Sequence, residues 1–166
     1  MLNQSDIRET VRYSDTGLPT QKVDALGYSG TLMYDDRDIA MIRETNALGW
    51  NTEYTYDYPT GKVSAIKNPN DVTSKIEYDL WGREVARSRF SDGAGVRLMT
   101  REYDDIHIPN SSTETTYYTA EGDSKTNVQY SDGWGRPIMS LVSTEKPDQY
   151  SAQQIRYDTH GNPTYT

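Results

Sequence analysis

Short runs in which hydrophobic and polar residues alternate make up much of this chain. The clearest is 72–78, where valine, serine, isoleucine and tyrosine occupy every second position and threonine, lysine and glutamate fall between them. A period of two is typical of a β-strand with one packed face and one face in water. A similar run, 62–67, precedes it, and the segment 68–71 between the two is typical of a turn. The pattern therefore predicts an antiparallel hairpin over 62–78.

Four further hairpins are predicted by the same combination of alternation and turn residues. Their strand ranges are 38–43 with 50–56, 84–90 with 96–103, 113–119 with 125–130, and 137–143 with 151–157. Residues 6–13 allow a short helix, but Thr10, Val11 and the repeat that follows favour a strand. No segment has a convincing helical face, so we expect an all-β protein with strands of about six residues, or ~20 Å.

A six-residue motif, Tyr78–Arg83, recurs between the predicted hairpins. It places tyrosine, aspartate, glycine and arginine in a fixed order, and degenerate copies begin at residues 13, 34, 56, 103, 130 and 157, so that successive copies are 21 to 27 residues apart. The copy at 56 has an extra residue before its glycine, and those at 13 and 130 carry an inserted serine. The residues assigned to the motif are Tyr13, Asp15, Gly17, Tyr34, Asp35, Tyr56, Asp57, Gly61, Tyr78, Asp79, Gly82, Arg83, Tyr103, Asp104, Tyr130, Asp132, Gly135, Arg136, Tyr157, Asp158 and Gly161.

Each position of the motif has a structural use. The tyrosine ring can cover the preceding hairpin while its hydroxyl points to the rim, and the aspartate can accept hydrogen bonds from backbone N–H groups two residues on. The glycine supplies the positive φ that the turn needs. Arg83 and Arg136 begin the next strand, where a guanidinium can pair with a carboxylate or stack on a ring. Because the motif recurs at several points of the chain, it is better interpreted as a connection between successive hairpins than as a functional site, which normally occurs once.

The copies continue nearly to both ends of the sequence, so we expect a single repeat array over residues 1–166. About six antiparallel hairpins would form a curved, spiralling sheet, because a hairpin is marginal alone and gains stability by burying its face against its neighbours. No separate toxin or catalytic domain is expected.

Composition and charge exclude several classes of function. Only 34% of the residues are hydrophobic, and 14 tyrosines accompany a single phenylalanine, which suits half-buried surfaces. The net charge of −8 opposes binding to nucleic acid or anionic lipid. The chain has no cysteine, no apolar run long enough to span a bilayer, and no signal-peptide pattern in Met1–Asp6.

Candidate catalytic or metal-binding groups are best explained by turn chemistry. The pairs Asp35-Asp36 and Asp104-Asp105 lack any calcium-loop pattern, and neighbouring side chains on a strand point to opposite faces. His107 and His160 have no third ligand at a metal spacing, and the glycine pairs match no nucleotide-binding fingerprint. We therefore expect no catalytic, cofactor or metal residues and no enzymatic activity.

Three tryptophans leave a second interpretation open. Trp50, Trp81 and Trp134 lie beside aspartate and asparagine, which are residue types that stack on sugars and bond their hydroxyls. The alternative to a structural role is thus a carbohydrate-binding or adhesive surface. The competing interpretation is that these rings cover neighbouring hairpins.

The pattern Tyr-Asp-x-x-Gly-Arg, followed by a strand and an Asn/Gly turn, resembles the YD repeat of the Rhs family. This family includes bacterial Rhs polymorphic toxins, the B and C components of insecticidal toxin complexes, and animal teneurins. The resemblance covers about residues 13–162, with Tyr78–Arg83 the cleanest copy. It implies a strip of hairpins that spirals into a hollow shell, which in the bacterial toxins encloses a toxic domain.

For this chain the resemblance implies a shell segment of a larger secreted or cell-surface protein. Its partners would be neighbouring YD repeats and an encapsulated toxin or effector domain. The Asp-Pro-x-Gly-Leu self-cleavage region of the family has no counterpart in this sequence.

Overall fold

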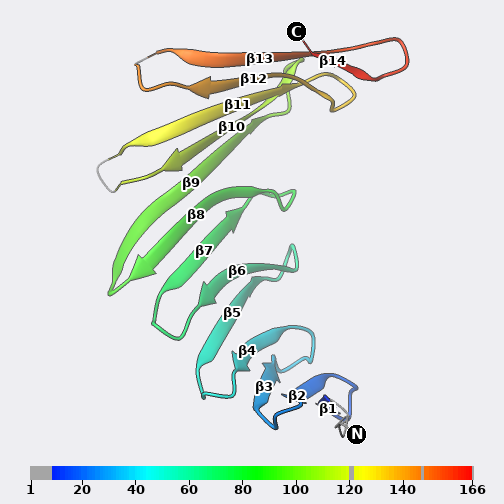
Figure 1. Ribbon diagram of the computed structural model, residues 1–166, viewed down its shortest axis with the longest axis vertical. Coiled ribbons are helices and arrows are strands. Elements are labelled where there is room, and N and C mark those ends of the chain that lie inside the picture. The colour runs from blue at the N-terminus through cyan, green and yellow to red at the C-terminus, as the bar shows by residue number, and fades with distance from the viewer. Residues whose placement is uncertain (1–8, 120–121, 147, 166) are drawn as a thin grey trace, which may run out of the picture. The chain divides into compact units, whose positions relative to one another are not determined.

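The computed structural model describes residues 9–119, 122–146 and 148–165, and within these ranges the chain forms strands and turns without a helix (Figure 1). No helix there is long and apolar enough to cross a membrane. The signal-peptide assessment of Met1–Asp6 falls outside the described residues. The strands are β1 Thr10–Tyr13, β2 Pro19–Val23, β3 Ser29–Tyr34, β4 Met41–Thr45, β5 Asn51–Asp57, β6 Lys62–Lys67, β7 Thr73–Tyr78, β8 Glu84–Ser91, β9 Ala94–Asp104, β10 Asn110–Tyr117, β11 Ser124–Ser131, β12 Pro137–Ser143, β13 Tyr150–Tyr157 and β14 Pro163–Tyr165.

The strands are hydrogen-bonded in chain order, from β1 to β14, in an antiparallel sheet. The all-β hairpin array predicted from the alternation is therefore confirmed. Eleven of the 14 described strands correspond to strands predicted from the sequence. Strands β2, β3 and β14 are additional, because their sequences alternate weakly and did not predict strands.

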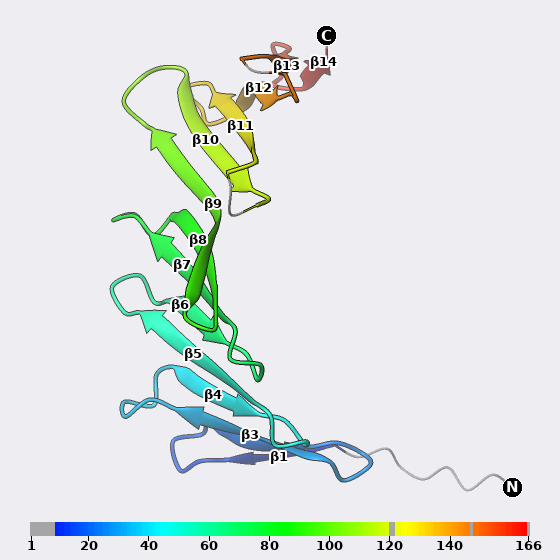
Figure 2. The same ribbon diagram turned by 90° about the vertical axis from the view of Figure 1, so that its left-hand side faces the viewer.

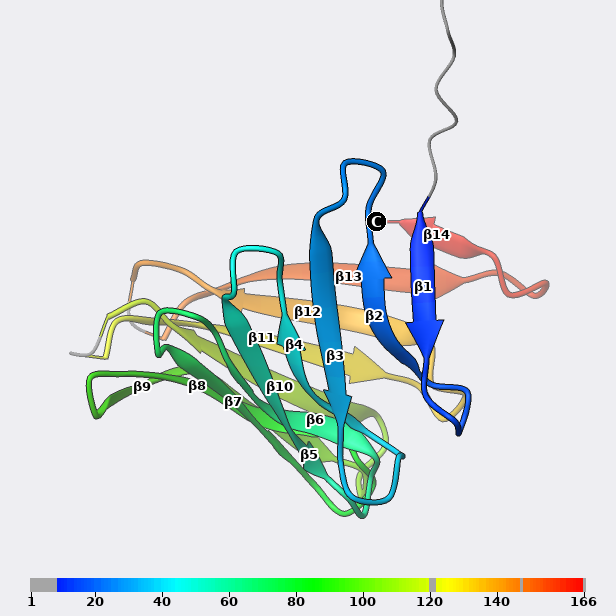
Figure 3. The ribbon, with the colours of Figure 1, turned by 90° about the horizontal axis from the view of Figure 1, so that it is seen from below.

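The chain divides into two compact units. The first comprises Met1–Lys75 and Phe90–Ala94, and the second comprises Ile76–Arg89 and Gly95–Thr166. In the first unit, β1, β2 and β3 lie side by side with alternating directions (Figure 3). In the second, β10 and β11 form a long hairpin with eight paired residues on each strand (Figure 2). The single array over residues 1–166 stays a prediction.

A β-bulge accompanies several of the Tyr-Asp crossings between strands, whereas the β9–β10 and β13–β14 crossings keep a constant register. Tyr13, Tyr34 and Tyr56 lie opposite Pro19, Met41 and Val63, and in each case the register shifts by one residue at the tyrosine. A bulge of this kind twists the strand locally and re-aims its side chains. At the β11–β12 crossing Ser131, rather than Tyr130, lies opposite the first residue of the next strand. The inserted serine therefore moves Tyr130 one place out of the motif register.

Almost nothing in the described residues is fully buried. Ala40, Ala86 and Ser88 are 8%, 5% and 6% exposed, and no large side chain is less than 2% exposed. Most strand positions are half-buried instead. A sheet of this type has no continuous hydrophobic core, so its stability comes from backbone hydrogen bonds and from the tyrosine side chains that cover its faces.

Two strands begin three residues away from the predicted start. Strand β4 begins at Met41 rather than at residue 38, because Asp38 has a φ of 53° and belongs to the preceding turn. Strand β10 begins at Asn110 rather than at residue 113, since Ser111 and Ser112 pair with Asp104 and Tyr103 across the ladder. The predicted ranges 62–67 and 137–143 agree with β6 and β12.

Candidate functional site

The turn at Asp79 shows how the motif is built. The backbone N–H of Asp79 donates to the Arg83 carbonyl at 2.9 Å, and Gly82 N–H donates to the Asp79 carbonyl at 3.0 Å. Within the loop that these two backbone bonds close, Asp79 Oδ1 accepts hydrogen bonds from Trp81 N–H at 2.9 Å and Arg83 N–H at 2.8 Å. The side chain thus satisfies backbone donors that the reversal leaves without strand partners, as an Asx turn does.

The same turn closes the copies at Asp132 and Asp158. Asp132 Oδ1 accepts from Trp134 and Arg136 N–H at 2.9 and 3.0 Å, and Asp158 Oδ1 accepts from residues 160 and 162, both at 2.8 Å. Gly82, Gly135 and Gly161 have φ of 73°, 77° and 83°. A residue with a Cβ is strained at such angles, which is why glycine occupies the fourth position of the turn.

The turns at the other ends of the hairpins use this geometry too, which sequence reasoning missed. Asp24, Asn46 and Asn68 each accept two backbone N–H groups on Oδ1, at 2.9–3.0 Å. The detectable signal is an Asp or Asn three residues before a glycine, as in 24–27 and 46–49. Where Asn68 lacks that glycine, Asp71 adopts a φ of 60° in its place.

Four copies of the motif depart from this turn, among them the copy at Asp35, whose N–H donates to the Ala40 carbonyl and whose Oδ1 accepts from Ile39 and Ala40 N–H. In the copy that begins at Tyr13, Ser14 takes the aspartate position: its N–H donates to the Leu18 carbonyl at 2.8 Å, and its Oγ accepts from Leu18 N–H at 3.1 Å. The assignment of Asp15 to that position is therefore corrected; Ser14 replaces the aspartate and is not an insertion. At Asp57 the extra residue changes the turn, so that the Asp57 carbonyl accepts from both Thr60 and Gly61 N–H. Asp104 Oδ1 accepts from Ile106 and His107 N–H.

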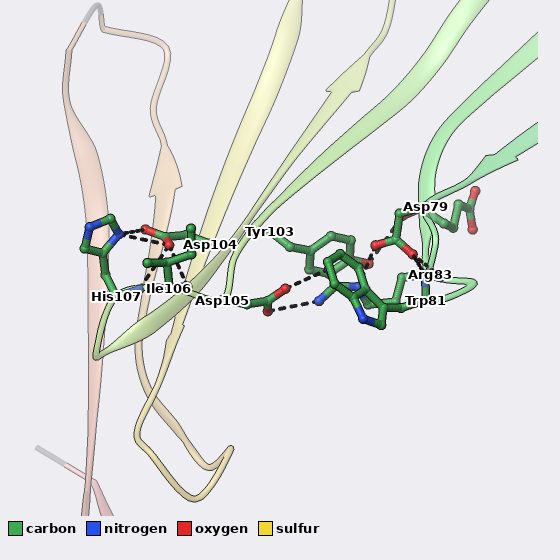
Figure 4. Close-up of polar contacts among 9 residues, drawn as sticks. Asp79, Trp81, Arg83, Tyr103, Asp104, Asp105, Ile106 and His107 are labelled. Atoms are coloured by element: carbon green, nitrogen blue, oxygen red, sulfur yellow. Dashed lines mark hydrogen bonds and ion pairs between the residues drawn. The ribbon is translucent and has the colours of Figure 1, made fainter.

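Arg83 connects two successive copies of the motif, as Figure 4 shows. Its Nε donates to Asp79 Oδ2 at 2.7 Å within its own turn. Its two terminal nitrogens bind Asp105 of the next copy, at 3.0 Å to Oδ1 and 2.8 Å to Oδ2. Its guanidinium carbon also lies 3.8 Å from the Tyr103 ring centroid and 5.0 Å from that of Trp81. We call Asp79, Arg83, Tyr103 and Asp105 the Arg83 clasp.

Two other links of this kind join neighbouring copies. Arg136 Nε donates to Asp132 Oδ2 at 2.8 Å, and its guanidinium lies 4.4 Å from the Tyr157 ring of the following copy. In the first compact unit, the Tyr58 hydroxyl donates to Asp35 Oδ2 at 3.1 Å, again from one turn to the preceding one. The partners of these groups lie about 20 residues away in sequence. The sequence therefore predicted that Arg83 and Arg136 could pair with a carboxylate or stack on a ring, but it did not predict which residue each contacts.

Four motif tyrosines make the same hydrogen bond within their own hairpin. The hydroxyls of Tyr34, Tyr56, Tyr103 and Tyr157 donate to the carbonyls of Pro19, Met41, Glu84 and Pro137, at 3.0, 3.0, 3.3 and 2.8 Å. Each acceptor is the first residue of the partner strand. The hydroxyls therefore close the base of the hairpin rather than point to the rim, because a half-buried phenol is stabilised by a partner.

Hydrogen bonding also lowers the pKa of the turn carboxylates. For Asp79 and Asp132, partial desolvation raises the pKa, but donors from Arg83 and Arg136 outweigh it, and the pKa of each lies below its usual value. Ile39 N–H, the His107 side chain and the Asn162 side chain are the main causes that lower the pKa of Asp35, Asp104 and Asp158. The Asp105 carboxylate is the main cause that raises the pKa of Arg83.

The remaining candidate residues lie in or beside separate turns in the part of the chain that the structure describes. No group of three His, Cys, Asp or Glu side chains is placed to hold a metal ion there. His107 lies in the Asp104 turn, with Nδ1 2.7 Å from Asp104 Oδ2, and His160 is exposed in the Asp158 turn. Trp50, Trp81 and Trp134 are 58%, 75% and 86% exposed and lie in or beside separate turns.

Comparison with known proteins identifies the fold. No family model matches the sequence, and no curated protein matches it. Among solved structures, TcdB2-TccC3 is similar over 93% of this chain, with a TM-score of 0.74 and 16% identity. The forms of TcdB2-TccC3 without its hypervariable C-terminal region and with Cdc42 give a TM-score of 0.73 and 13% identity over the same share.

This chain spans 10% to 13% of the length of those proteins. The identity is low, so the likeness is one of fold alone. The chain therefore shares its all-β fold with a segment of TcdB2-TccC3.

Proposed function

We propose that this chain is a structural segment of an Rhs/YD-repeat shell, part of a larger secreted protein that encloses or presents a toxin or effector domain. The observation that carries this proposal is the chain of links between successive Tyr-Asp turns, with the Arg83 clasp as its most elaborate member. Links of this type hold hairpins in register without a hydrophobic core, which is what a wall one sheet thick requires.

A structural role also accounts for the carboxylates better than catalysis does. A general acid or base at neutral pH needs a pKa near the working pH, and a raised carboxyl pKa is the usual sign of one. The turn carboxylates Asp35, Asp79, Asp104, Asp132 and Asp158 instead have lowered pKa values because each is hydrogen-bonded within its turn. They act as fixed acceptors.

In this proposal the mechanism is mechanical. The ladder of backbone hydrogen bonds resists opening, because separating two strands breaks every bond of that ladder together. The net charge of −8 keeps the wall in solution and disfavours self-association. The partners are adjoining YD repeats and the enclosed domain, and the parent protein is exported.

Protease protection of the full-length parent protein tests the proposal. The gene that encodes this segment is expressed complete, and the domain that follows the repeat array is labelled and exposed to protease in the intact protein and as an isolated domain. Enclosure predicts that the domain in the intact protein is cut much more slowly than the isolated domain. Equal rates, or a reading frame in which a surface anchor replaces the effector domain, would contradict it.

A matched pair of variants links that result to this segment. Arg83→Ala in the full-length protein removes the clasp, whereas Arg89→Ala removes an exposed arginine of β8 that belongs to no motif. We expect faster cleavage of the enclosed domain in the first variant and unchanged cleavage in the second.

A further inference from the structure

The first compact unit contains a cavity of about 270 Å³ that the Tyr-Asp motif does not use. It is lined by the ends of two neighbouring hairpins, β4–β5 and β6–β7. The side chains that matter for its chemistry are Trp50, Asn51, Glu53, Lys67, Pro69 and Asp71. This volume is slightly below the roughly 300–1,000 Å³ of sites that hold drug-sized ligands, so it suits a single ring of a small molecule.

The apolar wall of the cavity is held by two turns. The backbone of Trp50 is fixed at both ends by Asn46, whose Oδ1 accepts from Trp50 N–H at 3.0 Å and whose N–H donates to the Trp50 carbonyl at 3.0 Å. Pro69 lies in the turn that Asn68 closes in the same way. The Trp50 side chain is nevertheless 58% exposed. A large flat ring on a pre-formed turn is thus left accessible beside the cavity.

The polar wall offers both acceptors and donors. Glu53 Oε1 accepts from Arg43 at 2.8 Å, and Asp71 Oδ1 accepts from Lys67 Nζ at 2.9 Å, so one oxygen of each carboxylate is already engaged. Within the described residues, Glu53 Oε2 and Asp71 Oδ2 make no hydrogen bond. Asn51 accepts from the Thr45 hydroxyl at 2.7 Å through its oxygen, which leaves its amide N–H groups as donors.

These groups match a sugar ring more closely than other ligands. A pyranose has a C–H face that packs on an aromatic ring and hydroxyls that both donate and accept, which is the combination that Trp50, the two carboxylates and Asn51 present. The net charge of −8 opposes a phosphate or a sulfated glycan, and the nearby cations, Lys67 of the cavity wall and Arg43, are already paired with Asp71 and Glu53. We propose that this cavity is a subsite for one neutral pyranose unit of a saccharide, which adds a ligand to the structural role above.

The other two tryptophans are in different surroundings. The Arg83 guanidinium lies 5.0 Å from the Trp81 ring centroid, so that ring is part of the region around the clasp. Trp134 is 86% exposed at the tip of the Asp132 turn. The cavity therefore distinguishes Trp50 from the two rings that the sequence grouped with it, and Trp134 serves as the matched control.

Titration of the 166-residue chain with a defined set of saccharides tests the subsite. The probes are maltohexaose, cellohexaose, chitohexaose and mannohexaose, with heparin as the anionic contrast, and binding is followed by saturation-transfer NMR and tryptophan fluorescence. We expect at least one neutral probe to bind with a millimolar Kd, and heparin to bind none. We expect Trp50→Ala to weaken binding by about tenfold or more, a loss of ~1.4 kcal/mol, and Trp134→Ala to leave it unchanged.

A second variant guards against loss of the fold. Asp71→Asn keeps a residue type that tolerates the positive φ of this position and removes one acceptor charge, so it is expected to fold normally and to bind several-fold more weakly. Absence of binding by all four neutral probes at about 10 mM, equal losses in Trp50→Ala and Trp134→Ala, or full affinity in folded Asp71→Asn would each overturn the proposal.

Discussion

The Arg83 guanidinium carbon lies 3.8 Å from the centroid of the Tyr103 ring, although 19 residues separate them in the chain. The same guanidinium binds carboxylates on both sides, Asp79 in its own turn and Asp105 in the next. One side chain thus contacts a ring and two acids from successive copies of the motif. Planar geometry makes this possible, since a guanidinium can stack through its face while its edge donates hydrogen bonds.

This arrangement predicts that Arg83→Lys destabilises the chain although the charge is kept. Lysine has no fork for Asp105 and no plane for Tyr103, so both contacts weaken. We expect the melting temperature to fall by roughly 2–4 °C, as a loss of about 1 kcal/mol would give in a chain of this size. Thermal unfolding followed by circular dichroism measures it.

The control for this experiment is Arg89→Lys, an exposed position on β8. Its melting temperature should equal that of the parent chain. Combining Arg83→Lys with Tyr103→Leu should give less than the sum of the two single effects, because the residues are in contact. Strict additivity would mean that the stacking contributes nothing.

The turn glycine supplies a second prediction. Gly82 has a φ of 73°, and a β-branched residue there is strained, at a cost of about 1–3 kcal/mol. Gly82→Val should therefore lower stability well beyond His107→Ala, since the His107 side chain is 77% exposed. Chemical denaturation of the two variants provides the comparison. Equal midpoints would show that the turn tolerates a side chain at this position.

Stability should fall as pH falls through the range in which the turn carboxylates protonate. The pKa of Asp79, Asp132 and Asp158 is lower in the folded chain than the usual value of ~3.9. Folding is then favoured above that value, and the advantage is lost as pH falls toward the folded pKa. We expect a constant melting temperature between pH 7 and pH 5, and a decline below about pH 4.

A charge-removing variant isolates this effect. Asp132→Asn keeps an oxygen that can accept from the turn N–H groups, as Asn46 and Asn68 do, but loses the charge that Arg136 binds. Its stability deficit should be present at pH 7 and should vanish at the lowest pH, where Asp132 is itself protonated. Asp24→Asn serves as the control, because Asp24 contacts no guanidinium among the described residues. A deficit of Asp132→Asn that stays the same at every pH would refute the assignment.

The sequence predicted the repeat and its turn chemistry better than it predicted the partners. Residue pattern and flanking turn residues placed β6 and β12 correctly. They missed β2 and β3, where polar residues and Gly30 obscure the pattern. Asp105 was outside the motif, and its role as a partner of Arg83 depends on how two hairpins pack. Packing of this kind leaves no local signal in the chain, so neither the clasp nor the Trp50 cavity could be inferred without coordinates.

The motif tyrosines give a final prediction, in which Tyr157 is compared with Tyr130, the tyrosine that the inserted Ser131 displaces. The Tyr157 hydroxyl donates to the Pro137 carbonyl at 2.8 Å, while the Tyr130 hydroxyl makes no hydrogen bond within the described residues, since Ser131 takes its place in the register. Tyr157→Phe should cost about 0.5–1.5 kcal/mol, the usual net value of one hydrogen bond. Tyr130→Phe should be close to neutral, because it removes a hydroxyl without a partner. Paired urea unfolding curves distinguish the two, and equal losses would mean that the position of Ser131 in the register does not decide whether the tyrosine closes its hairpin.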